Sequence, residues 1–221
     1  NRMKFFVDQG LFEDVSDVWK KHGLDSQLSA ARSTMTVNGK QWGVPLTYYQ
    51  WGVYYRTDIF KKYGLGEPRS IADLMHICKT LKQNGVTPFT IGTKYLWTAA
   101  GWFDFLNLRV NGYDFHMSLM DGNISYEDSR LDKVFDIWGD LARKGYFIEN
   151  HASLSWQEGQ APMINGDAAM YLMGNFVVPN LKEGGLSGKI GYFQFPVIDG
   201  NVRTWEEAPT DSVHIPSKAK N

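Results

Sequence analysis

Apolar residues recur at helical spacing over residues 70–84, and this pattern predicts the clearest helix of the chain. Ser70 is a good N-cap, and Asp73 stands three residues later, where an acidic side chain can complete a capping box. Gly85 follows the stretch and suits the left-handed residue that ends many helices. Cys78 lies on the apolar stripe, which favours a buried, unreactive thiol over a reactive one.

Two further stretches with the same spacing predict helices at residues 128–144 and 153–165, which end at Gly145 and Gly166. Shorter helices are predicted at residues 58–63, 98–110 and 176–181. Short β-prone segments lie between the helices, at residues 42–45, 53–55, 87–91, 168–173, 190–195 and 213–215. Strands that alternate with helices predict an α/β fold with mainly parallel pairing. Because no linker rich in Pro, Gly or Ser divides the chain, two lobes would have to be joined by the strands themselves.

Composition narrows the class of protein. The chain of 221 residues is 43% hydrophobic and 21% charged, which is typical of a globular protein and not of a disordered one. Its net charge of −1 argues against a protein that binds nucleic acid mainly through phosphates. No apolar run is long enough to span a membrane. Cys78 is the one cysteine, so neither an internal disulfide nor a multi-cysteine zinc site can form.

The sequence motifs of common catalytic and cofactor sites are missing. There is no nucleophile elbow, no phosphate-binding loop and no dinucleotide-binding glycine motif. The five histidines are too scattered to suggest a metal site. A glycosidase needs two facing carboxylates, and no pair stands out among the 24 acidic residues. These observations favour a protein that is not an enzyme and that needs no cofactor or metal.

Aromatic residues make up 14% of the chain, and several follow predicted strands. The carboxyl ends of strands are where α/β folds bind ligands. Flat rings with polar neighbours suit a sugar, since the ring faces cover its C–H groups and the polar groups pair with its hydroxyls. Packing in the core is the alternative interpretation, and the sequence leaves it open. The rings placed in this way are Tyr48, Tyr49, Trp51, Tyr95, Trp97 and Phe176.

Five segments in order resemble the extracellular solute-binding proteins of bacterial ABC transporters, in the family 1 carbohydrate-type branch. The segments are residues 39–65 (GKQWGVP followed by VYYRTDIFKKYGL), 68–74, 85–89 (GVTPF), 164–176 (INGDAAMYLMGNF) and 191–216. The sequence departs from the family pattern at three places. Residues 69–71 read Arg-Ser-Ile, Phe176 replaces a tryptophan, and Thr210-Asp211 stands where many members have glycines.

The resemblance implies a periplasmic-binding-protein-like α/β fold with two lobes of the type II style, a ligand cleft and a hinge. Residues 1–50 and 174–211 would form part of the first lobe, residues 51–173 most of the second, and residues 212–221 the start of a return into the second. Family members are nearly twice this length, so the chain is expected to lack N-terminal and C-terminal parts, with the signal peptide among them. Carried over by position, the ligand-binding residues would be Tyr48, Tyr49, Trp51, Tyr95, Trp97, Asn175, Phe176, Thr210 and Asp211.

The function implied is capture of a sugar or sugar-like solute and its delivery to the membrane permease of an ABC importer. Such a protein is expected to be a monomer in the periplasm, or lipid-anchored on the outer surface of a Gram-positive cell, with no nucleic-acid partner. Two alternatives come from other classes. One is a carbohydrate-active hydrolase with Asp104 and Asp211 as an acid/base pair, and the other is a protein-interaction domain that uses the aromatic patch.

Overall fold

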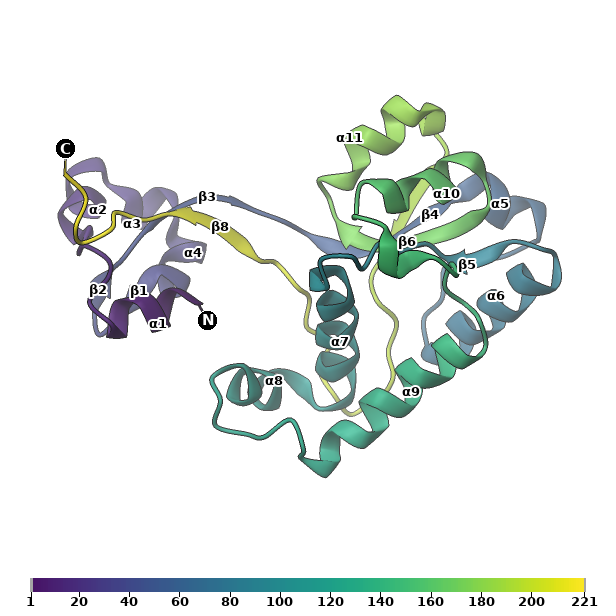
Figure 1. The fold of residues 1–221 in the computed structure, drawn as a ribbon, viewed down its shortest axis with the longest axis horizontal. Helices are drawn as coiled ribbons and strands as arrows, with labels where there is room; N and C mark the ends of the chain where they lie inside the picture. Colours follow the sequence, from purple (N-terminus) through teal and green to yellow (C-terminus); the bar gives the residue numbers. More distant parts are fainter. Residues whose placement is uncertain (1, 221) are drawn as a thin grey trace. The chain divides into compact units, whose positions relative to one another are not determined.

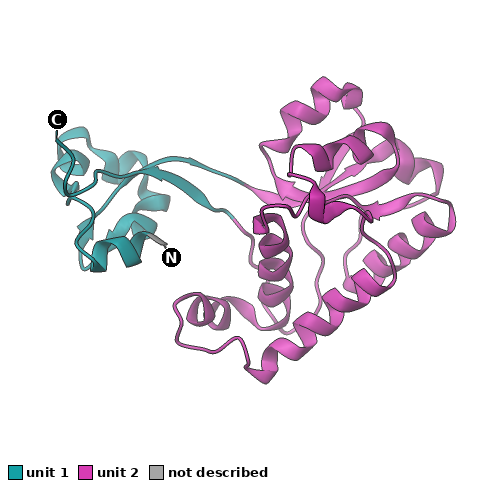
Figure 2. Ribbon diagram, in the orientation of Figure 1, with its two compact units in different colours: residues 1–49, 208–221 teal, residues 50–207 magenta. Residues whose placement is uncertain are grey.

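The computed structural model describes residues 2–220 and divides the chain into two compact units (Figures 1 and 2). Unit 1 comprises residues 1–49 and 208–221, and unit 2 comprises residues 50–207. Across the described residues, no helix is both long enough and apolar enough to cross a membrane.

Unit 1 is built from short helices and two antiparallel strand pairs. Its helices are α1 (Arg2–Asp8), α2 (Ser16–His22), α3 (Leu24–Gln27), α4 (Ser29–Arg32) and the 3-10 turn η1 (Ser33–Met35). Its strands are β1 (Thr36–Val37), β2 (Lys40–Gln41), β3 (Val44–Tyr48) and β8 (Thr210–Val213), paired as β1 with β2 and β3 with β8. The small core centres on Trp19, which is fully buried and donates its indole N–H to the Gly43 carbonyl at 2.9 Å.

Unit 2 contains a sheet in the order β5-β6-β4-β7, covered by helices. The strands are β4 (Trp51–Arg56), β5 (Thr87–Phe89), β6 (Ala168–Gly174) and β7 (Ile190–Phe193). The helices are α5 (Thr57–Lys62), α6 (Ile71–Gln83), α7 (Trp97–Val110), α8 (Gly112–Met120), α9 (Asp132–Arg143), α10 (Ala161–Asn165) and α11 (Val177–Leu181). Three 3-10 turns are η2 (Ser129–Leu131), η3 (His151–Ser153) and η4 (Glu158–Gln160), and η5 (Lys182–Leu186) is a π-helical segment. In Figure 1, α10 and α11 lie on one side of this sheet, and α6, α7 and α9 lie toward the other.

The predicted helix at residues 70–84 is confirmed with its caps. Ser70 Oγ accepts the Asp73 N–H at 3.2 Å, and Asp73 Oδ2 accepts the Ser70 N–H at 2.9 Å, which is a capping box. At the other end Gly85 has a φ of 74°, and its N–H donates to the Lys82 carbonyl. Cys78 is fully buried on this helix, as predicted, and burial raises the pKa of its thiol, which disfavours the reactive thiolate.

The predicted single helix at residues 153–165 is wrong. Leu154 is extended, and Ser155 and Glu158 then bond to each other's backbone N–H groups, so a new turn starts at η4. That turn runs into α10, which ends at Gly166 as predicted. The periodic pattern did not reveal this because a capping pair inside it restarts the helix.

The prediction of mainly parallel pairing is also wrong. β5 and β6 are parallel, but β4 is antiparallel to both of its neighbours, β6 and β7. The helical connection from β5 to β6 joins two parallel strands, as expected, but the connection from β4 to β5 through α5 and α6 joins strands of opposite direction. β4, which follows the segment that arrives from unit 1, is inserted between β6 and β7 and runs against them.

The two units differ from the residue ranges expected for the two lobes. Residues 174–207 pack with residues 51–173 because β7 pairs with β4 in the same sheet. Residues 212–220 belong with unit 1, where β8 pairs with β3 and Phe12 forms a bridge with Pro216. The assignment of the expected ranges to the lobes of a whole protein stays a prediction.

Candidate functional site

Four aromatic rings from distant parts of the sequence meet in unit 2. We call Trp51, Trp97, Trp156 and Phe176 the aromatic cluster. The ring centroids of Trp51 and Trp97 are 5.8 Å apart and those of Trp156 and Phe176 are 5.1 Å apart, both edge to face. Trp97 lies 6.3 Å from both Trp156 and Phe176, and Trp51 lies 6.3 Å from Phe176. These distances are in the favourable range for aromatic pairs.

Three of the four rings lie at or next to the start of an element, and Trp156 lies in the turn before η4. Trp51 begins β4, Trp97 begins α7, and Phe176 precedes α11 directly after β6 ends. The Trp51 ring packs directly on Gly101 of α7, where a Cβ would lie 2.6 Å from Trp51 Cζ3. A side chain at position 101 would therefore displace Trp51 from the cluster.

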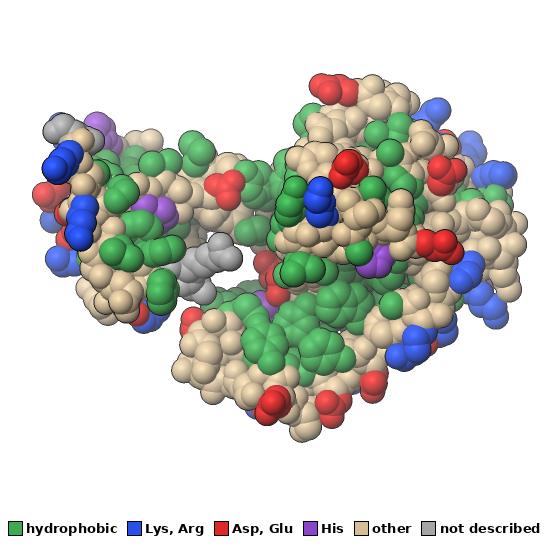
Figure 3. Space-filling view, in the orientation of Figure 1, with side chains coloured by type: hydrophobic (Ala, Val, Ile, Leu, Met, Phe, Trp, Pro, Cys, Tyr) green, Lys and Arg blue, Asp and Glu red, His purple; other side chains and the backbone are tan. Residues whose placement is uncertain are grey.

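The four rings of the cluster differ in how much of each is exposed to solvent. Trp51 is 6% exposed, and its buried indole N–H has no hydrogen-bond partner among the described residues. Trp97 is 37% exposed, while Trp156 and Phe176 are half-buried. Figure 3 shows apolar side chains reaching the surface of unit 2 over α7 and toward α9. Core rings are covered on both sides, so this partial exposure is what distinguishes the cluster from ordinary core packing.

Two other predicted residues of unit 2 lie near the ends of the same elements. Tyr95 is 62% exposed in the loop before α7, and Lys94 Nζ lies 5.6 Å from its ring centroid. Asn175 is exposed, and its backbone N–H donates to the Gln50 carbonyl at 2.9 Å. This bond ties the turn after β6 to the residue that begins unit 2.

One acidic side chain, Asp104, lies on α7 next to the cluster, and two more, Glu206 and Glu207, come from the end of unit 2. Trp97, Gly101 and Asp104 follow each other at helical spacing on one face of this helix. Burial, with a smaller effect from the charge of Glu207, raises the pKa of Asp104 to about 7. Burial also raises the pKa of Glu207, and the charge of Glu206 adds to it. At neutral pH the Asp104 carboxyl can therefore both donate and accept hydrogen bonds.

Two buried basic side chains accompany these acids. Arg109 is 1% exposed and forms an ion pair with Glu206, and it also donates to the carbonyls of Phe195 and Trp205. His116 Nε2 lies 3.8 Å from Glu207 Oε1, and burial lowers the pKa of His116, so the ring is neutral near pH 7. The second carboxylate oxygen of Glu206 is buried without a hydrogen-bond partner in the described structure.

The remaining predicted residues lie together in unit 1, on the ribbon formed by β3 and β8. Tyr48 is paired with Thr210 across the ribbon, and Tyr48 is 71% exposed. The Tyr49 hydroxyl donates to Asp211 Oδ2 at 2.6 Å, and this bond raises the pKa of Tyr49. The carboxylate that was expected to accept ligand hydroxyls already accepts one from the protein.

The predicted residues therefore form two groups, one in each unit. Trp51, Trp97 and Phe176 are brought together in unit 2, with Tyr95 and Asn175 at the edges of the same elements. Tyr48, Tyr49, Thr210 and Asp211 are brought together in unit 1. The sequence reasoning missed Trp156, because the residues around it resembled a helix stripe. The turn signal of Ser155 and Glu158 could have revealed it.

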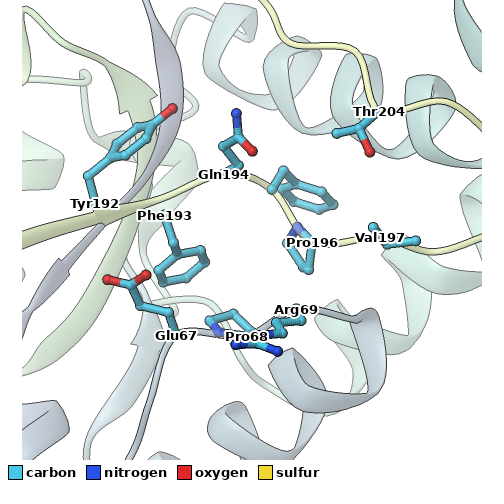
Figure 4. Close-up of a pocket in the computed structure, with 10 residues that line it drawn as sticks. Glu67, Pro68, Arg69, Tyr192, Phe193, Gln194, Pro196, Val197 and Thr204 are labelled. Atoms are coloured by element: carbon cyan, nitrogen blue, oxygen red, sulfur yellow. The ribbon is translucent and has the colours of Figure 1, made fainter. Parts of the chain in front are cut away.

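Each unit also has a cavity that includes no residue of the aromatic cluster. In unit 2 a cavity of about 660 Å³ lies beside β7 and the loop of Glu67, Pro68 and Arg69 (Figure 4). In unit 1 a cavity of about 450 Å³ includes Thr210 in its lining. Within residues 2–220, no group of His, Cys, Asp and Glu is arranged to hold a metal ion.

The comparisons with known proteins agree on one family. The family described as bacterial extracellular solute-binding protein matches residues 1–221. An uncharacterised ABC transporter extracellular-binding protein of Pyrococcus horikoshii is 28% identical over 98% of this chain and 48% of its own length. The multiple sugar-binding protein of Streptococcus mutans is 26% identical over 72% of this chain and 39% of its own length.

Solved structures agree. The bacterial solute receptor AcbH, reported with an exclusive preference for β-D-galactopyranose, is 33% identical with a TM-score of 0.79, over 100% of this chain and 56% of its own. A chitin oligosaccharide binding protein is 25% identical with a TM-score of 0.90, over 99% of this chain and 55% of its own. The chain thus spans about half the length of the proteins it matches. On the match of the whole sequence, the chain belongs to the bacterial extracellular solute-binding protein family.

Proposed function

We propose that this chain is part of the substrate-binding component of an ABC importer that captures a sugar and delivers it to a membrane permease. The observation that carries the proposal is the aromatic cluster, whose rings are held in fixed positions yet remain partly exposed. Ring faces of this kind cover the apolar faces of a sugar, and the acids Asp104, Glu206 and Glu207 can pair with its hydroxyls.

The ligand-binding residues that we assign are Trp51, Trp97, Trp156, Phe176, Tyr95 and Asn175 of unit 2, with Tyr48, Tyr49, Thr210 and Asp211 of unit 1. The named relatives support the choice of ligand, since one is called a multiple sugar-binding protein and two of the solved structures are described with galactopyranose and chitin oligosaccharide. The description of the family as extracellular supports a location outside the cytoplasm. We assign it to the periplasm or to a lipid anchor, as a monomer.

The test is a titration of the full-length gene product with a panel of mono- and oligosaccharides. Tryptophan fluorescence and calorimetry measure the binding. One class of sugar should give a saturable response. Trp97→Ala and Trp156→Ala should each weaken its binding by about tenfold, the value of one lost stacking contact. Trp138→Ala is the matched control, because Trp138 lies on α9 outside the cluster and its loss should leave the affinity unchanged.

Two outcomes would contradict the proposal. If no sugar gives a saturable response with the folded protein, the carbohydrate assignment is wrong. If Trp97→Ala and Trp156→Ala bind as the wild type does, the cluster is not the site. The hydrolase alternative is tested in the same samples, since it requires that the sugar be cleaved and that Asp104→Asn abolish the cleavage.

A further inference from the structure

The chain passes between the two units at two places, next to Gln50 and next to Glu207. The segments on either side of these places are bonded to each other. The Tyr49 N–H donates to the Pro209 carbonyl at 3.0 Å, and the Trp51 N–H donates to the Glu207 carbonyl at 3.2 Å. Any change in the arrangement of the units must be absorbed by backbone at or beside these segments.

The side chain of Tyr192 links residues 50–51 to the sheet of unit 2. The ladder of β4 and β7 ends at the pair Val53 and Phe193, so β7 offers no backbone partner to Trp51. The Tyr192 hydroxyl takes that place and donates to the Trp51 carbonyl at 3.1 Å. Figure 4 shows Tyr192 and Phe193 pointing to opposite faces of the strand, which leaves the Tyr192 ring free to reach along β4.

Three further contacts define the position of Tyr192. Its ring lies so close to Gly52 that a Cβ there would overlap it. Gln50 Nε2 donates to the Tyr192 hydroxyl at 3.2 Å, so the residue that begins unit 2 is attached to the same oxygen. The Tyr192 ring also packs on Tyr54, with 5.4 Å between the centroids. The hydroxyl therefore bonds to Gln50 and Trp51 together, and Trp51 carries the most buried ring of the aromatic cluster.

Burial of the Tyr192 hydroxyl, together with a nearby carboxylate, favours its protonated form. Burial and the nearby charge of Glu206 both raise the pKa of Tyr192, and Gln50 and Arg109 oppose this less strongly. Arg109 in turn holds the other segment, through the Trp205 carbonyl and the Glu206 carboxylate. Both segments that lead out of unit 2 are thus attached to it by side chains, Tyr192 for one and Arg109 for the other.

We propose that Tyr192 is a positioning residue for ligand binding, which holds residues 50–52 in one conformation and so keeps Trp51 in place in the aromatic cluster. This rests on the proposed function, because it assigns a role at the sugar site proposed there. Without the hydroxyl, residues 50–51 have more conformations to lose when the ligand binds. The ligand then binds more weakly although none of its own contacts is removed.

The experiment compares Tyr192→Phe with the wild type in the full-length gene product, by two readouts. The first is the dissociation constant of the sugar identified with the wild type, measured well below the melting temperature. We expect binding to weaken about threefold to tenfold, the range of one or two hydrogen bonds. The second is the distribution of distances between labels attached to Lys20→Cys in unit 1 and Lys133→Cys in unit 2, both exposed positions, in ligand-free protein. Cys78 is buried and does not take the label.

We expect Tyr192→Phe to broaden the distance distribution without ligand. Gln50→Ala, which removes only an exposed amide, should do the same to a smaller extent. Tyr54→Phe is the control, since Tyr54 lies opposite Tyr192 in the register and its hydroxyl has no hydrogen bond to residues 50–52 among the described residues. A purely structural role for Tyr192 would lower thermal stability and leave both readouts at their wild-type values, and that result would overturn the proposal. If no sugar binds the wild type, the proposed function fails, and the ligand-free distribution alone decides the role of Tyr192.

Discussion

At the scale of single residues, the most informative side chain is Asp104. Its pKa is raised to about 7, first by burial and then by the charge of Glu207. A carboxyl with a raised pKa contributes stability that is fully present below its unfolded pKa and is lost as the pH rises through the folded pKa. Wild-type stability should therefore fall between about pH 4 and pH 7 through this group. Asp104→Asn keeps the shape and removes the titration.

We expect Asp104→Asn to match the wild type near pH 4 and to exceed it above pH 7. Discounted for partial exposure, the gain is about 1–2 kcal/mol, or about 3–6 °C in melting temperature. Circular dichroism melts at a series of pH values measure it. The lowered pKa of His116 acts in the opposite direction but is common to both proteins. Asp121→Asn, at an exposed position, is the control, and an Asp104→Asn effect that does not vary with pH would contradict the argument.

At the scale of elements, the capping box of α6 gives a prediction of stability. Ser70→Ala removes the acceptor of the Asp73 N–H and should lower the free energy of unfolding by about 1 kcal/mol. This corresponds to about 2–4 °C in melting temperature. Ser118→Ala makes the same chemical change within α8, where the serine caps nothing, and should have no destabilising effect. Equal losses in both variants would show that the cap contributes nothing.

An element could be predicted where the residues that determine it lie close together in the sequence, and could not where they lie far apart. The apolar stripe, N-cap and closing glycine of α6 lie within sixteen residues of sequence and predicted it with its ends. The break before η4 rests on a bond between Ser155 and Glu158, which a periodicity argument ignores. The direction of β4 is set by strands more than a hundred residues away, β6 and β7. In the site, Trp51, Trp97 and Phe176 could be named from their places after strands, but their meeting with Trp156 is a property of the folded chain.

At the scale of the whole molecule, the two units should differ in stability. The buried core of unit 1 consists of few side chains around Trp19, whereas β6 of unit 2 is buried along its whole length. β3 and β8 form a two-stranded ribbon on which Leu46 is 74% exposed and Val213 is 58% exposed. A small core and an isolated ribbon bury too little apolar surface to be stable alone. Unit 1 of this chain should therefore open at lower free energy than unit 2.

Native-state hydrogen exchange followed by mass spectrometry measures this difference on the chain of 221 residues. Amides of β3 and β8 should exchange by a local opening at low denaturant, well before those of β4 and β6. The reason is that unit 1 is joined to unit 2 through only two chain segments. Unit 1 can therefore unfold locally without breaking the sheet of unit 2. If the amides of β3 exchange as slowly as those of β6, the two units unfold as one cooperative body. If they exchange faster in this chain than in the full-length gene product, further sequence covers the ribbon, and the exposed faces of Leu46 and Val213 are where it packs.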